Sequence, residues 1–151
     1  MLKTVDIYTD GACSGNPGIG GYCAILIYKG VEKIISGCVK DTTNNRMELL
    51  SVIEGLKALN EKCIVNLYSD SQYVVDAFNQ NWIENWQNNG WRTSNKKEVK
   101  NADLWKELLV LFDKHQVNFI KVKGHADNEF NNRCDKIAVS EYRKLLEENK
   151  I

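Results

Sequence analysis

The order of strand-like and helix-like segments is the feature of this 151-residue chain that most restricts the folds open to it. Apolar residues that alternate, or that run together between turn residues, predict strands at 3–10, 22–28, 31–39, 63–68 and 117–122. Apolar residues spaced three and four apart predict helices at 43–59, 71–78, 102–115 and about 132–146. We therefore expect an α/β fold: a mixed five-stranded sheet, an antiparallel hairpin beside parallel strands, with helices on both faces.

Size and composition predict one domain spanning residues 1–151, because a chain of this length with 43% hydrophobic residues can bury a substantial core. No apolar run approaches the roughly 18 residues that a membrane span requires. The first residues pass directly into a strand pattern, so we expect no signal peptide. The five cysteines form no CxxC pair and their number is odd, which favours free thiols in a reduced, cytoplasmic protein.

The net charge is zero, which argues against a protein that coats nucleic acid nonspecifically. The charge is nevertheless uneven along the chain. Residues 92–101 have a local net charge of +3, from four basic residues against one acid: Arg92, Lys96, Lys97 and Lys100 against Glu98. A short basic stripe on a neutral protein is compatible with a small surface that contacts phosphates.

Four acids stand at the end of a predicted element or in a turn: Asp10, Glu48, Asp70 and Asp135. Each has an ordinary structural explanation when taken alone. Asp10 fits a strand-to-turn pair, Glu48 a capping box, and Asp70 the cap of the following helix. Asp135 fits a solvated helix position.

Taken together, the four acids favour a metal site. If the strand ends that carry Asp10 and Asp70 are neighbours, and helices present Glu48 and Asp135 beside them, the carboxylates repel one another unless cations lie between them. Hard oxygen ligands suit Mg²⁺ or Mn²⁺ rather than zinc. Two such ions about 3.5–4 Å apart can hold one phosphate between them. The residues therefore predict metal-dependent phosphodiester chemistry.

Several motifs follow one another in an order that is far more specific than any of them alone. They are Thr9-Asp10-Gly11-Ala12 with Gly15-Asn16-Pro17-Gly18, Thr42-Thr43-Asn44-Asn45-Arg46-Met47-Glu48, Ser69-Asp70-Ser71, a tryptophan-rich segment at 81–101, and Val122-Lys123-Gly124-His125-Ala126 with the residues 131–135. In these motifs the chain resembles the bacterial type I ribonuclease H family, from about Lys3 to Ala138.

The resemblance implies an endoribonuclease that hydrolyses the RNA strand of RNA–DNA hybrids and leaves 3′-hydroxyl and 5′-phosphate ends. Asp10, Glu48, Asp70 and Asp135 would be ligands of two Mg²⁺ ions, with Mn²⁺ as a substitute, and His125 would assist proton transfer or product release. The remaining residues would bind substrate: Cys13, Asn16, Asn44, Asn45 and Gln72 in the minor groove, Thr43 and Asn101 in a DNA-phosphate pocket, and Trp82 and Trp86 in a handle for the DNA strand. The partner would be the hybrid duplex, with no membrane, and the protein a monomer.

The sequence departs from the family pattern in two places. Uncharged or acidic residues stand in the tryptophan-rich segment where Lys or Arg is often found, namely Glu84, Gln87, Asn88 and Asn89. In the loop between His125 and Asp135, many relatives carry a more rigid stretch of Gly, His, Pro and Glu, where this chain has Asp127, Asn128, Glu129 and Phe130. Three alternatives remain: another nuclease of the same fold, such as a transposase or resolvase core; a noncatalytic hybrid-binding module; and a structural calcium-binding domain, which lacks EF-hand spacing here.

Overall fold

The computed structural model of the chain describes residues 1–93, 95–122 and 128–148. Five strands form one sheet: β1 (Lys3–Cys13), β2 (Gly18–Tyr28), β3 (Val31–Thr42), β4 (Cys63–Ser69) and β5 (Gln116–Lys121). The helices are α1 (Asn44–Lys57), α2 (Gln72–Asn79), α3 (Trp82–Asn88), α4 (Ala102–Asp113) and α5 (Glu129–Glu148). None of the helices within these described ranges is long and apolar enough to span a membrane.

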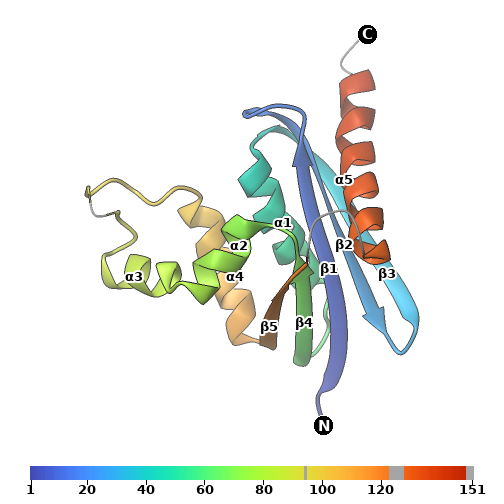
Figure 1. Cartoon of the computed structure of the whole chain (residues 1–151), viewed down its shortest axis with the longest axis horizontal. Coiled ribbons are helices and arrows are strands. Elements are labelled where there is room, and N and C mark those ends of the chain that lie inside the picture. The colour runs from blue at the N-terminus through green and yellow to red at the C-terminus, as the bar shows by residue number, and fades with distance from the viewer. Residues whose placement is uncertain (94, 123–127, 149–151) are drawn as a thin grey trace.

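The sheet is mixed, in the order β3-β2-β1-β4-β5 (Figure 1). β1 pairs antiparallel with β2, and β2 with β3, so the first three strands form a meander. The hairpin between β2 and β3 turns at Lys29 and Gly30, which both have positive φ, as a tight two-residue turn requires. β4 pairs parallel with β1, and β5 parallel with β4. This topology confirms the predicted hairpin beside parallel strands.

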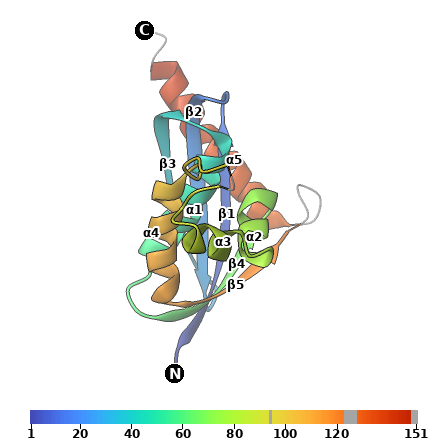
Figure 2. The same ribbon diagram turned by 90° about the vertical axis from the view of Figure 1, so that its left-hand side faces the viewer.

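Helices cover both faces of the sheet, as the sequence predicts (Figures 1 and 2). Alternation along β1 and β2 directs Ile7 and Ala24 to one face, where they pack with Leu49 and Val52 of α1 in the main core. α4 packs against α1 on this side. The opposite face of β1, β2 and β3 is covered by α5, with a smaller core that contains Cys23, Ile25, Cys134 and Ala138.

Close backbone approaches fix where α1 and α5 lie on the sheet. A Cβ on Gly11 would lie 2.3 Å from the carbonyl carbon of Met47, so only glycine lets the first turn of α1 reach β1. A Cβ on Gly21 would lie 2.0 Å from the carbonyl oxygen of Ala138, so α5 rests directly on the backbone of β2. These two contacts set the positions of the acids that α1 and α5 carry.

Several elements differ from the sequence-based expectation, among them β2, which begins at Gly18 and not at residue 22. α5 begins at Glu129, one turn before the predicted start near residue 132. The tryptophan-rich segment, for which no helix was predicted, contains the short helix α3, and Trp82, Trp86 and Trp91 pack against the main core. The spacing of Trp82 and Trp86 places both rings on one side of α3, and this spacing outweighs the polar neighbours.

Candidate active site

Three acids from three elements meet at one end of the central strands. Asp10 lies near the end of β1, Glu48 in the first turns of α1, and Asp70 directly after β4. Each offers a carboxylate oxygen within 4.8 Å of the others. The parallel register pairs Tyr8 with Tyr68, so Asp10 on β1 and Asp70 just after β4, each two residues further along, lie at the same end of these strands. The predicted convergence of these three acids is therefore found in the structure.

Burial makes this cluster electrostatically costly without a cation. The exposed fractions of Asp10 and Glu48 are 4% and 5%. Burial, followed by the charge of Asp70, raises the pKa of Asp10 to about 8. Burial and the nearby Asp10 raise the pKa of Glu48 well above its usual range. Glu48 Oε2 has no hydrogen-bond partner among the described residues. An oxygen-rich, partly unsatisfied donor set of this kind fits a hard divalent cation such as Mg²⁺.

Asp135, the fourth predicted ligand, lies on α5 outside this three-acid cluster but close to it. Its charge is one of the contributions that raise the pKa of Asp10. The thiol of Cys134 donates to the carbonyl oxygen of Tyr8 at 3.2 Å, which ties this turn of α5 to β1. Asp135 is half-buried and faces a surface hollow along α5. The structure therefore places Asp135 beside the cluster, at its α5 side.

Asn131 is a residue at this site that the sequence reasoning did not single out. It lies one turn before Asp135 on α5, is 1% exposed, and its Nδ2 donates to Asp70 Oδ2 at 3.5 Å. Its Oδ1 has no partner among the residues that the structure describes. The signal that could have found it is the spacing of four between Asn131 and Asp135, which puts both on one helix face. His125, in contrast, lies outside the described residues.

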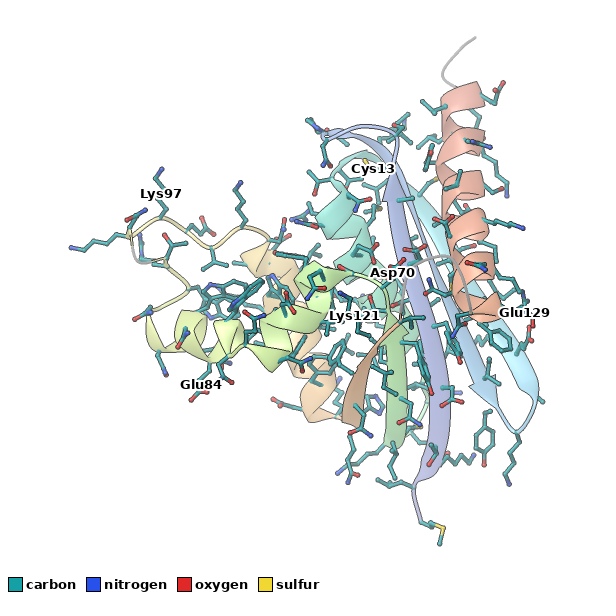
Figure 3. The ribbon with its side chains drawn as sticks, viewed as in Figure 1. Cys13, Asp70, Glu84, Lys97, Lys121 and Glu129 are labelled. Carbon is teal, nitrogen blue, oxygen red and sulfur yellow. The ribbon has the colours of Figure 1, made fainter. Side chains whose placement is uncertain are left out.

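The predicted minor-groove residues lie at the turn after β1 and at the starts of α1 and α2. Asn16 Oδ1 accepts a hydrogen bond from the backbone N–H of Asn44 at 2.9 Å, which brings these two residues together. The Cys13 thiol is held by the carbonyl oxygen of Gly15. Asn45 is exposed on the first turn of α1, and Gln72 is exposed at the start of α2, where it donates to Asp76. Figure 3 labels Cys13 near the upper end of β1 and Asp70 below it, and the predicted minor-groove residues come from this part of the molecule.

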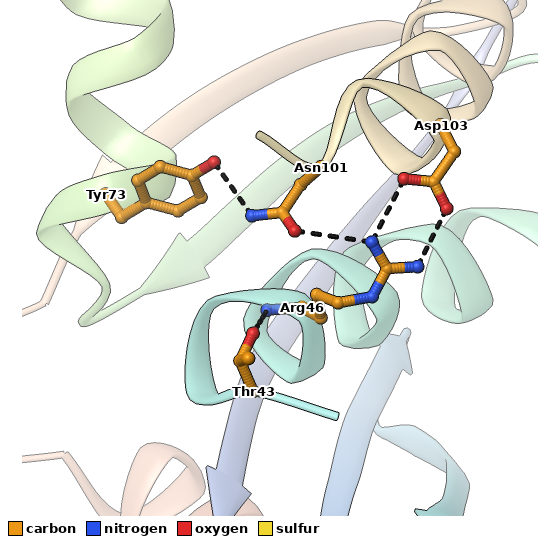
Figure 4. A network of polar contacts seen from close by, with 5 residues as sticks. All are labelled: Thr43, Arg46, Tyr73, Asn101 and Asp103. Carbon is orange, nitrogen blue, oxygen red and sulfur yellow. Dashed lines mark hydrogen bonds and ion pairs between the residues drawn. The ribbon is translucent and has the colours of Figure 1, made fainter. Parts of the chain in front are cut away.

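Thr43 and Asn101, predicted to form a phosphate pocket, are far apart in sequence but are joined by Arg46 (Figure 4). Thr43 caps α1, its Oγ1 accepting from the backbone N–H of Arg46 at 3.3 Å. Asn101 Oδ1 accepts from Arg46 Nη1 at 3.3 Å. The structure thus brings the two predicted residues to one place, beside a guanidinium that the sequence reasoning did not assign.

In the tryptophan-rich segment the rings and the charges are separated. The Trp86 ring packs against those of Trp82, Trp91 and Trp105, at centroid distances of 6.3, 6.2 and 5.6 Å. The basic residues of the following stretch are exposed; Figure 3 shows Lys97 far from the sheet. Trp82 and Trp86 are therefore placed to hold the segment on the core, while Arg92, Lys96, Lys97 and Lys100 face solvent.

The structure is that of an α/β protein with a mixed five-stranded sheet and a carboxylate cluster, able to hold a metal ion, where the central parallel strands end. Comparison with known proteins gives its family. The family model described as RNase H matches residues 2–143. The chain therefore belongs to the ribonuclease H family. It is 62% identical over 147 residues to a protein named ribonuclease H from Caldanaerobacter subterraneus subsp. tengcongensis, covering 97% of this chain and 96% of the relative.

Two further relatives support the same assignment. A protein named ribonuclease H from Acetivibrio thermocellus is 63% identical over 143 residues, which are 95% of this chain and 97% of that protein. The crystal structure of LC9-RNase H1, described as a type 1 RNase H with the type 2 active-site motif, superposes with a TM-score of 0.85 at 30% identity, covering 95% of this chain and 74% of that one. The expected ribonuclease H-like fold is thus confirmed.

Proposed function

We propose that this protein hydrolyses the RNA strand of RNA–DNA hybrids with two divalent cations, Mg²⁺ or in its place Mn²⁺, leaving 3′-hydroxyl and 5′-phosphate ends. The observation that carries the proposal is the buried cluster of Asp10, Glu48 and Asp70 in a chain of the ribonuclease H family. The relatives at 62% and 63% identity bear the name ribonuclease H, which supports the choice of substrate.

Each acid has a role in this proposal. Asp10 and Asp70 would hold the cations, together with Glu48 from α1 and Asp135 from α5. The bound cations would lower the pKa of a water molecule and stabilise charge on the leaving 3′ oxygen. The carboxylates would position the scissile phosphate and, once charged, compensate the cations. Asn131 would keep Asp70 in place through its Nδ2.

Proton transfer and substrate choice are assigned to other residues. His125 would transfer a proton or assist product release, because an imidazole titrates near neutral pH. The 2′-hydroxyl distinguishes RNA from DNA in the wide, shallow minor groove of a hybrid. Cys13, Asn16, Asn44, Asn45 and Gln72 would form the surface that contacts this groove. Thr43 and Asn101 would bind a phosphate of the DNA strand, with the basic residues after α3 as a weaker handle.

The first experiment is cleavage of an end-labelled RNA–DNA hybrid with Mg²⁺ or with EDTA. Single-stranded RNA, double-stranded RNA and DNA duplexes of the same sequence are the matched substrates. We expect cutting of the RNA strand in the hybrid alone, and only with the metal. Cleavage of DNA instead would move the protein to the transposase or resolvase class. Binding without cleavage in both Mg²⁺ and Mn²⁺ would identify a noncatalytic hybrid-binding module.

A further inference from the structure

The side chain of Asn101 is held in an unexpected way. Asn101 is the residue before α4, with φ 63° and ψ 22°, and its side chain makes no capping hydrogen bond. Asparagine is preferred at such a position because it usually caps the helix. Here Oδ1 instead accepts from Arg46 Nη1, and Nδ2 donates to the hydroxyl of Tyr73 at 3.2 Å (Figure 4). Two neighbours, one on each side, thus fix the orientation of this amide.

Arg46 is itself fixed by Asp103. Its Nη1 donates to Asp103 Oδ1 at 3.0 Å and its Nη2 to Asp103 Oδ2 at 2.7 Å, a bidentate ion pair between α1 and α4. A guanidinium in a planar fork of this kind has little freedom to turn toward another anion. Because Asp103 also balances its charge, Arg46 acts on its surroundings mainly through the bond to Asn101.

Three protons around this network have no acceptor among the described residues. Thr43 Oγ1 accepts from the backbone N–H of Arg46, so among the described residues its own hydroxyl proton is still available to donate a hydrogen bond. The Tyr73 hydroxyl accepts from Asn101 Nδ2 and, at 2.9 Å, from Trp105 Nε1, which leaves its proton uncommitted too. Asn101 Nδ2 has a second proton. Neutral donors of this kind commonly bind the phosphate oxygens of a nucleic-acid backbone.

We propose that Arg46, anchored by Asp103, is a positioning residue that orients the amide of Asn101 so that Nδ2 faces a phosphate of the DNA strand. Tyr73 fixes the other side of the same amide. The proposal rests on the proposed function, because the DNA strand of a hybrid is the ligand. It adds to the predicted pair, Thr43 and Asn101, the residues that set the direction of the donor.

The first test is Asp103→Asn, because two explanations predict opposite signs for it. Removing a negative charge near a phosphate strengthens binding if only the overall field matters. Loss of the anchor instead releases Arg46 and Asn101, and we expect KM for the hybrid to rise about 5–10-fold with kcat changed less than about twofold. The matched control is Glu107→Gln, which also removes one negative charge from α4 and breaks the other α1–α4 ion pair, Lys57–Glu107 at 2.8 Å. The control should leave KM within about twofold of the wild-type value.

The second test places a single uncharged methylphosphonate at successive positions of the DNA strand. At one position we expect KM of the wild type to rise about tenfold, and that rise to shrink below about twofold in Asn101→Ala and Asp103→Asn. Thermal unfolding of each variant identifies any that lose their fold. A lowered KM in Asp103→Asn, or a KM equal to that of the control, would overturn the inference. Cleavage with no sensitive position would overturn it while leaving the proposed function intact, whereas absence of hybrid cleavage by the wild type would overturn the proposed function itself.

Discussion

At the scale of single residues, position decides what an ordinary acid does. Asp10 and Asp70 belong to common turn and cap patterns, yet the structure brings them together with Glu48. We expect Asp10→Asn or Asp70→Asn to reduce hybrid cleavage with Mg²⁺ by at least about 10³-fold, because an amide cannot replace a charged metal ligand. The hybrid cleavage assay measures this loss, with circular dichroism to verify the fold. Near-normal turnover in either variant would contradict the assignment.

The raised pKa of Asp10 also predicts a pH dependence of stability when no divalent cation is bound. Between about pH 4 and about pH 8 the folded protein holds a proton at Asp10 that the unfolded chain has released. The free energy of unfolding should therefore fall as pH rises through this window, and Asp10→Asn should raise it at pH 8 by at least about 1 kcal/mol. Urea unfolding in EDTA at several pH values measures both effects. A free energy of unfolding that falls no more steeply with pH in the wild type than in the variant would exclude this explanation.

At the scale of elements, the site depends on how closely two helices approach the sheet. Gly21→Ala would place a Cβ 2.0 Å from the carbonyl oxygen of Ala138, so α5 has to move away from β2. We expect the free energy of unfolding to fall by about 1–3 kcal/mol. Cleavage should also decrease, because Asp135 lies one turn from Ala138. Ser140→Ala, on the exposed side of α5, is the control and should change stability by less than about 0.5 kcal/mol. Equal stability of the two variants would contradict the close-packing argument.

Local patterns predicted most elements but few of the side-chain contacts between them. The alternation in β1 and the spacing of Leu49 and Val52 in α1 are local signals, so these elements were predictable. Arg46 and Asp103 are 57 residues apart, and no local pattern indicates that they pair. Asn131 gave too weak a signal, because its burial depends on where α5 docks. The convergence of Asp10 and Asp70 was predictable because parallel strands end at the same edge of a sheet.

At the scale of the whole molecule, the charge of the tryptophan-rich segment predicts how substrate affinity depends on salt. Affinity for a hybrid should fall as salt rises. The slope should be shallow, because α3 carries no basic residue and the segment can therefore contact few phosphates. Replacing Gln87, Asn88 and Asn89 by lysine should steepen the slope by roughly 0.7–0.9 for each new contact. Binding measured from about 50 to 200 mM salt tests this prediction. Equal wild-type affinity at both ends of that range would refute it.

The central place of β1 in the sheet has a consequence for synthesis on the ribosome. β1 leaves the ribosome before the other strands of the sheet, yet one of its edges pairs with β4, about 60 residues later, and α5 covers one of its faces. A nascent chain can form the β1–β2–β3 meander early, but Asp10 cannot meet Asp70 until β4 has emerged, nor lie beside Asp135 until α5 has followed. A nascent chain therefore lacks the complete set of acids until α5 has emerged, so this candidate site is among the last features of the described structure to form.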